Sequence, residues 1–130
     1  GQRLDVEQGQ LRFTGALGQR ELLAELCQAA IFALNTSFES FSFQTVMAMA
    51  AGIPVIVTDI GNLPEIVTDG EEGVLVRPDD RAAIVAAVKK ISGDSAFRRV
   101  IIANARKKAE AFSIRRATDE LLGLAAAIRP

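Results

Sequence analysis

The chain has 130 residues with 15 basic and 16 acidic side chains, so its net charge is −1, and 49% of its residues are hydrophobic. This length and composition predict one domain with a substantial buried core, and the balanced charge argues against a nucleic-acid partner. The chain contains no His, which excludes Ser-His-Asp and Cys-His catalysis and imidazole metal ligands, and its aromatic residues are all Phe, which argues against a base-stacking platform.

The first elements predicted along the chain are a strand, a helix and a second strand. Residues 11–15 are expected to form a short strand that ends at Gly15. Residues 21–30 carry leucines at helical spacing, and Cys27 lies among them, so we expect it to be a small core residue. A single cysteine cannot form an internal disulfide, which fits a reducing compartment and predicts a cytoplasmic location. The apolar run 31–35 is typical of a parallel strand covered on both faces.

A helix built from small residues is predicted over 44–51, and a buried strand over 53–58. Gly52 lies between them, where a left-handed C-terminal cap is expected, and Pro54 follows it. These two residues also interrupt the apolar run 46–57, which is too short to cross a bilayer, so we predict no transmembrane segment.

The remainder of the chain alternates turns, a strand and helices. A helical turn with proline near its start is expected over 63–67, and a strand over 73–76 follows an Asp-Gly turn at 69–70. Acidic or hydroxyl side chains then stand where helix N-caps are expected. The predicted helices are those capped by Asp79 or Asp80 with Ile84, Val88 and Ile91 on one face, by Asp94 or Ser95 with Phe97, Ile101 and Ala105, and by Ser113 with Ala117, Leu121, Leu124 and Ile128.

This alternation predicts a Rossmann-like α/β fold, a three-layer sandwich around a parallel sheet, in which ligands bind at the carboxyl ends of the strands. Glu39 lies in the loop between the predicted strand 31–35 and the predicted helix 44–51, so it is the candidate ligand-binding acid. The helix N-terminus beside it favours a phosphate-bearing ligand. Gln44 and Thr45 could donate to that phosphate from the first turn, although hydroxyl and amide side chains also occupy helix starts simply as caps.

Several of these segments together resemble a known family. The segments Ser-Phe-Glu-Ser-Phe at 37–41 and Ala-Met-Ala-Ala-Gly-Ile-Pro-Val-Ile-Val-Thr-Asp at 48–59 resemble the signature of retaining GT-B glycosyltransferases of the "glycosyl transferases group 1" family. Linked motifs in the right order are more specific than a single glycine pattern. The likeness continues through four further segments, 60–67, 69–70, 73–76 and 78–79.

The resemblance implies that the chain is the C-terminal, donor-binding half of a GT-B fold, in an enzyme that moves a hexose from a nucleotide-diphosphate sugar to an acceptor. In this family the first Glu of a Glu-x7-Glu motif contacts the donor sugar near the reacting carbon, and Glu39 matches it, so Glu39 is the expected catalytic residue. The family needs no metal, and neither a metal nor a cofactor is expected. The residues expected to bind the donor are Glu39, Phe41, Ser42, Phe43, Gln44, Thr45, Gly15 and Ala16.

The sequence departs from the family pattern at the second Glu and in the loop. Met47 stands where the family has the Glu that binds the nucleotide ribose, and a thioether is a poor acceptor. The loss of a charged hydrogen bond of about 1.5–3 kcal/mol would weaken nucleotide binding roughly 10- to 150-fold. Ser42 and Ser40 stand where the family usually or often has Gly. Either Ser42 tolerates the bend less well than Gly, or its hydroxyl supplies a contact.

The resemblance also predicts how the chain is organised. Residues 1–130 are expected to form one donor-binding domain without the first strand–helix units and without the N-terminal acceptor domain, which would bind a glycan, a lipid or a small molecule. The strands 11–15 and 31–35 would then pair directly or take another partner. We expect the isolated chain to be inactive.

Two alternatives remain open. A degenerate, non-catalytic GT-B-like scaffold or partner-binding domain is favoured by Met47 and by the serines at 40 and 42. Another Rossmann-like domain that binds a nucleotide or a phosphorylated metabolite is disfavoured by the match of several motifs.

Overall fold

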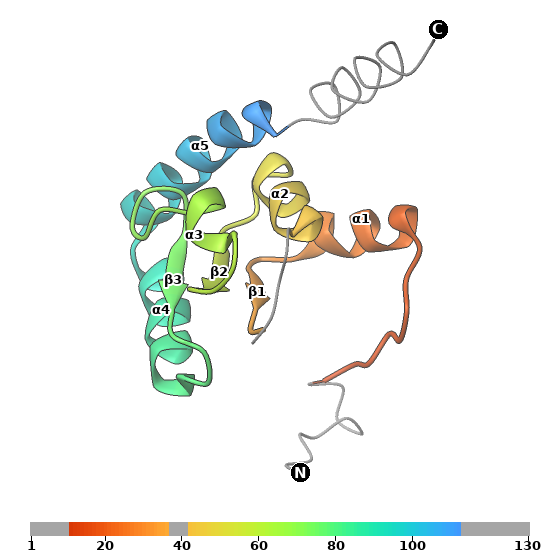
Figure 1. The fold of residues 1–130 in the computed structure, drawn as a ribbon, viewed down its shortest axis with the longest axis horizontal. Coiled ribbons are helices and arrows are strands. Elements are labelled where there is room, and N and C mark those ends of the chain that lie inside the picture. Colours follow the sequence, from red (N-terminus) through yellow and green to blue (C-terminus); the bar gives the residue numbers. More distant parts are fainter. Residues whose placement is uncertain (1–10, 37–41, 113–130) are drawn as a thin grey trace, which may run out of the picture.

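The computed structural model describes residues 11–36 and 42–112. Within these residues a parallel sheet forms from three strands in the order β1-β2-β3 (Figure 1). The strands are β1 (Phe32–Leu34), β2 (Val55–Thr58) and β3 (Val74–Val76), each inside the range that the sequence predicts. In the register of the sheet Leu34 lies beside Val57, and Thr58 lies beside Val76. The predicted parallel α/β architecture is confirmed.

Five helices occur in the described residues. They are α1 (Gln19–Gln28), α2 (Phe43–Ala50), α3 (Leu63–Ile66), α4 (Arg81–Gly93) and α5 (Ser95–Ala111). Figure 1 shows α4 and α5 on the β3 side of the sheet, and α1 and α2 on the β1 side. Among the described residues no helix is long and apolar enough to span a membrane.

The central strand β2 is covered on both faces, and this explains its purely apolar start. Its first three residues are buried, and they alternate between two clusters because successive side chains of a strand point to opposite faces. Val55 and Val57 pack with residues of α2, α3 and the C-terminal part of α5. Ile56 packs with residues of β3, α4 and the N-terminal part of α5. The sheet is therefore the middle layer of three, as predicted.

The capping residues of the helices follow the sequence closely. Asp80 accepts from the amide of Ala83 at the start of α4, and Asp94 accepts from the amide of Phe97 at the start of α5. Of each predicted pair of candidate caps, Asp80 and Asp94 are thus the ones used. Gly52 has a φ of 80°, so the left-handed residue expected after α2 is confirmed.

The prediction of a strand at residues 11–15 is wrong. This segment belongs to no strand, and in Figure 1 it arcs away from the sheet. Arg12 donates instead to both carboxylate oxygens of Glu25 in α1, at 2.8 and 2.7 Å. A strand needs a partner for its backbone groups, and no described neighbour pairs with this segment. The direct pairing with the strand at 31–35 that was considered above is therefore absent.

Two side chains are more exposed than predicted. Cys27 is exposed rather than buried in the core. The face of α1 that packs on the core carries Leu22 and Leu26, and Ala29 continues it just after the helix. The position after Leu26 is rotated by about 100° away from that face. Val88 is 38% exposed because Ala87 occupies the buried face of α4 in its place. The predicted helix that begins after Ser113 lies outside the described residues.

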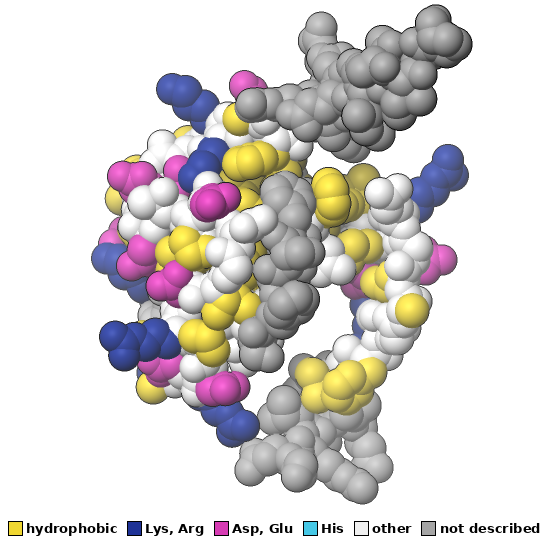
Figure 2. Space-filling view, viewed as in Figure 1, with side chains coloured by type: hydrophobic (Ala, Val, Ile, Leu, Met, Phe, Trp, Pro, Cys, Tyr) yellow, Lys and Arg dark blue, Asp and Glu magenta, His cyan; other side chains and the backbone are white. Residues whose placement is uncertain are grey.

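Charged side chains are dispersed over the described surface. In Figure 2 acidic and basic groups are interspersed over the face formed by β3, α4 and α5, and no large patch of one sign covers it. This distribution agrees with the small net charge of the chain.

Candidate functional site

The candidate site lies at the carboxyl edge of the sheet, where parallel α/β folds bind ligands. There β1 leads into the loop that carries Glu39, and β2 leads into Asp59. The amide of Asp59 donates to the carbonyl oxygen of Val76 at 2.8 Å, so the backbone pairing of β2 with β3 continues to this edge. The Asp59 side chain itself is exposed.

A buried hydroxyl holds the start of the loop. Thr58 is the last residue of β2 and has no exposed surface. Its Oγ1 donates to the carbonyl oxygen of Thr36 at 2.8 Å and accepts from the amide of Thr36 at 3.2 Å. A single side chain thus binds both backbone groups of the residue that precedes the segment 37–41.

A second pair of buried hydroxyls holds the end of the loop. Ser42 is the N-cap of α2, and its Oγ accepts from the amide of Thr45 at 3.2 Å. The two hydroxyl oxygens are 2.7 Å apart, Thr45 is fully buried, and Ser42 is nearly so. The amide of Val46 also donates to the Ser42 carbonyl oxygen at 3.3 Å. Thr45 therefore takes part in the capping contact of Ser42, and its predicted contact with the donor stays a prediction.

The remaining residues predicted at the start of α2 fall into two groups. Glu39 and Phe41 lie outside the described residues, so their part of the prediction stays a prediction. Phe43 and Gln44 form the exposed first turn of α2, and Phe43 is 68% exposed. Phe43 and Gln44 are therefore the exposed residues of the predicted site at the start of α2, next to the buried cap formed by Ser42.

Gly15 and Ala16 lie in the segment before α1, and both are exposed. Gly15 has a φ of 69°, and nothing lies within 4 Å of the place a Cβ atom would take, so the backbone is open to close approach there. This segment runs apart from the sheet in Figure 1, and the described structure does not bring it beside the start of α2. Their predicted donor contact stays a prediction.

Met47, which stands in place of the second Glu of the family motif, is half-buried and packs against the core cluster around α2. Its neighbours Val46, Ala48 and Met49 are buried. The packing of Met47 accounts for an apolar side chain at this position.

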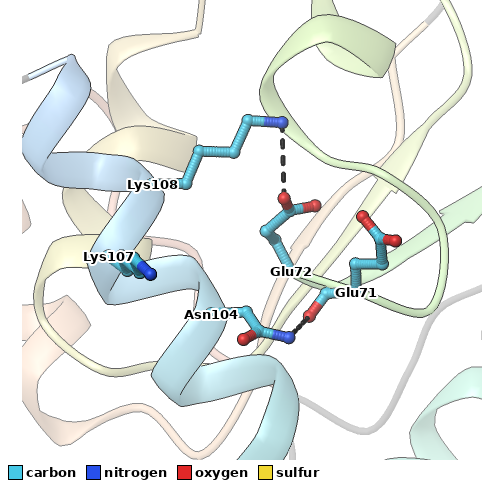
Figure 3. A pocket seen from close by; sticks show the side chains of 5 residues that line it. All are labelled: Glu71, Glu72, Asn104, Lys107 and Lys108. Atoms are coloured by element: carbon cyan, nitrogen blue, oxygen red, sulfur yellow. Dashed lines mark hydrogen bonds and ion pairs between the residues drawn. The ribbon is translucent and has the colours of Figure 1, made fainter.

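The described residues also line a cavity of about 390 Å³, which lies away from the carboxyl edge (Figure 3). Glu71 and Glu72 precede β3 and contribute one wall, and α5 contributes the other. Lys108 Nζ lies 3.5 Å from a carboxylate oxygen of Glu72, and the side-chain amide of Asn104 donates to the carbonyl oxygen of Glu71 at 2.9 Å. The other carboxylate oxygen of Glu72 accepts from the amide of Thr68 at 2.7 Å. These contacts connect the turn before β3 to α5, so we interpret the cavity as a structural junction.

Sequence reasoning missed the role of Thr58. From the sequence alone, Thr58 is predicted only as the last residue of a buried strand. The available signal was a hydroxyl side chain at the last position of an otherwise apolar strand, next to the edge that binds ligands. The cap formed by Ser42 had a clearer signal, because Ser or Thr at this position is a common start of a helix.

Known proteins share both the sequence and the fold of this chain. Glycogen synthase from Mycobacterium tuberculosis is 40% identical over 85 residues, which are 65% of this chain and 20% of that protein. D-inositol 3-phosphate glycosyltransferase from Geodermatophilus obscurus is 41% identical over 103 residues, 78% of this chain and 22% of that protein. Sucrose-phosphate synthase from Thermosynechococcus elongatus has 28% identity and a TM-score of 0.78, over 89% of this chain and 29% of that one.

The chain thus spans between a fifth and a third of the length of these three proteins. The model of the family described as glycosyl transferases group 1 matches residues 6–108, which are most of the chain. This chain belongs to the glycosyl transferases group 1 family.

Proposed function

We propose that this chain is the nucleotide-sugar-binding domain of a retaining glycosyltransferase, which moves a hexose from a nucleotide-diphosphate donor to an acceptor. The observation that carries the proposal is the carboxyl edge, where one loop joins β1 to the N-terminus of α2 and both ends of that loop are held by buried hydroxyls. Membership of the glycosyl transferases group 1 family adds the reaction class.

In this proposal Glu39 accepts hydrogen bonds from hydroxyls of the donor sugar near the reacting carbon. Phe41, Ser42 and Phe43 supply backbone amides to the sugar and the diphosphate. The N-terminus of α2 stabilises the negative charge of the diphosphate through the partial positive charge of its amides.

The other residues predicted to bind the donor have different roles in this proposal. The exposed Gln44 is a side-chain donor, whereas Thr45 closes the cap behind it. Gly15 and Ala16 are proposed to approach the donor by their backbone when the segment before α1 is brought to the same edge. The acceptor, a glycan, a lipid or a small molecule, is proposed to be bound by the N-terminal domain of the GT-B fold.

Calorimetric titration with UDP-glucose, GDP-mannose and ADP-glucose, and with UDP, GDP and ADP alone, tests the proposal. It uses this chain and a longer polypeptide that adds the first strand–helix units. We expect binding that Glu39→Ala abolishes for the sugar conjugates and weakens little for the free diphosphates, because Glu39 is assigned to the sugar. Asp59→Ala, which changes an exposed acid at the carboxyl edge of the sheet, is the matched control and should bind as the parent does.

The alternative is a non-catalytic scaffold of the same fold. The specific observation in its favour is the half-buried Met47 packed against the core, in place of the acid that binds ribose in the family. If both polypeptides are folded and neither binds any of the six ligands, the scaffold is the better conclusion.

A further inference from the structure

The outer face of α4 carries an open groove. Helix α4 packs on the sheet through Ala87 and Ile91. Val85 lies about 200° from Ala87 around the helix axis, so it faces away from the sheet, and it is 52% exposed. A groove of about 380 Å³ lies on this side and is lined by Arg81, Ala82, Val85, Ala86 and Lys89. All five lining residues are exposed, so no described element covers the groove.

The groove has an apolar centre and a cation at each end. Arg81 and Lys89 are eight residues apart, which corresponds to about 12 Å along the helix axis, and Val85 lies midway between them. Neither cation makes an ion pair with a described residue. None of the described acidic side chains lines the groove. These cations therefore complement an apolar side chain that has a carboxylate on either side.

The two helices nearest the groove also differ in charge from the rest of the chain. Residues 81–111, which form α4, α5 and their connection, contain eight basic and two acidic side chains, a net charge of +6. The whole chain has a net charge of −1, so its other residues have a net charge of −7. One of the two acids, Asp94, already pairs with Lys90. The charge of the surrounding helices therefore also favours an acidic partner.

We propose that the α4 groove docks an acidic amphipathic helix of a partner protein, which packs one apolar side chain on Val85 and places carboxylates against Arg81 and Lys89. On a helix, side chains at positions i and i+7 lie on one face about 10 Å apart, so two acids around an apolar residue match the spacing of the two cations. This interaction needs no nucleotide sugar, so it does not depend on the proposed function.

A membrane surface and a second copy of this chain fit the groove less well. Helices that lie on membranes bury bulky residues such as Trp, Phe and Leu, whereas this groove offers only Val85 between alanines. A second copy could present α1, whose Leu23 is 45% exposed. The two acids of α1, Glu21 and Glu25, already accept hydrogen bonds within their own chain. A separate protein with unpaired acids is therefore the better occupant.

A synthetic helical peptide tests the proposal with the whole 130-residue chain. The peptide is stapled as a helix and carries Glu, Leu and Glu at positions i, i+3 and i+7 of one face. Two control peptides replace both Glu by Gln, or the Leu by Ser. NMR titration of the backbone amides of the chain should show shifts confined to α4. Loss of both carboxylates should raise the dissociation constant about 2- to 30-fold, the equivalent of two exposed ion pairs.

Two pairs of residues on α4 provide matched variants. Lys89→Gln removes a cation of the groove and should weaken peptide binding about 1.5- to 5-fold. Lys90→Gln changes a lysine that pairs with Asp94 at 3.0 Å, and it should bind as the parent does. Val85→Ala should weaken binding about 2- to 10-fold through the loss of apolar contact. Val88→Ala, on the same helix but outside the groove, should bind as the parent does.

Several results would overturn the proposal. One is a peptide that causes no shifts in the chain. Another is an equal loss of affinity from the two lysine variants or from the two valine variants, which would show that the peptide does not bind in the groove. Binding of the chain to vesicles of phosphatidylglycerol and phosphatidylcholine that Val85→Ala weakens would assign the groove to a membrane. Sedimentation of the parent as a dimer and of Val85→Asp as a monomer would assign it to a second copy.

Discussion

Gly73, just before β3, lies against Val55 of β2, because a Cβ atom at position 73 would be 2.7 Å from the Val55 carbonyl oxygen and 2.6 Å from its Cγ2 atom. Val67 Cγ1 would lie 3.1 Å away. Real side chains do not approach backbone this closely, and the carbonyl oxygen belongs to the central strand. The close approach of the two strands at this point therefore requires glycine.

Gly73→Ala is expected to lower the free energy of unfolding by about 1–3 kcal/mol through overpacking. Urea unfolding measures the change. Gly93→Ala, at the end of α4, is the matched control, since nothing lies within 4 Å of its added methyl group and alanine is the better helix former. Equal losses from both substitutions would contradict the close approach at Gly73.

The junction between α5 and the turn before β3 should depend on Lys108. Its ammonium group pairs with Glu72, whose side chain is 11% exposed. Lys108→Met is expected to lower the free energy of unfolding by about 1–2 kcal/mol, a value between those of exposed and buried ion pairs. The reason is that the partly buried carboxylate of Glu72 loses its cationic partner. Thermal unfolding at low and high salt measures this loss. High salt should reduce the difference in melting temperature between the parent and Lys108→Met, because salt screens the ion pair. Lys107→Met, on the same helix and exposed, should leave the melting temperature unchanged.

Acid should weaken the start of α5 through Asp94. The hydrogen bond from the Phe97 amide, and then that from Lys90, lower the pKa of Asp94 below its ordinary value of 3.8. Since the folded chain binds this proton less readily than the unfolded chain, the contribution of Asp94 is full above pH 3.8 and is lost as the pH falls through the lowered pKa.

Asp94→Asn keeps a capping side chain and removes the charge. We expect its melting temperature to lie below that of the parent at neutral pH and to approach the parent value in acid. Melting curves at a series of pH values down to about pH 2 test this, because that range passes the ordinary pKa of a carboxyl group. A difference that stays constant into strong acid would contradict the assigned charge contacts.

Met47→Glu should restore the ribose contact that the family makes at this position. We expect nucleotide-sugar affinity to rise roughly 10- to 150-fold, the equivalent of one charged hydrogen bond. The chain should also become less stable, because the substituted side chain is half-buried against the core. Met47→Gln has a similar size without the charge and should gain less affinity. If Met47→Glu binds no better than Met47→Gln, ribose is not bound from this position.

Local chemistry explains why much of the fold was predictable. The apolar strands, the left-handed Gly52 and the acidic caps of α4 and α5 depend on nearby residues, so the sequence alone indicates them. Residues 11–15 were mispredicted because a strand also depends on a partner, which a local pattern does not contain. Cys27 was mispredicted because neighbouring leucines do not define which side of a helix meets the core.

The candidate site was predictable to a different extent. The loop, the acid and the following helix could be read from the order of the segments and from the family resemblance. The contact of Thr58 with Thr36 could not, because it joins positions that are far apart in the sequence and close only when β1 and β2 pair. The hydrogen bond between Ser42 and Thr45 is local. The sequence indicated a possible capping role for Gln44 or Thr45, whereas the capping side chain is that of Ser42.

The solvent-facing thiol of Cys27 has a practical consequence for all of these measurements. The chain contains no Trp or Tyr and only this one cysteine, so it lacks strong intrinsic fluorescence but offers one site for a maleimide dye. A fluorophore attached there would report on α1 without any other cysteine having to be removed first.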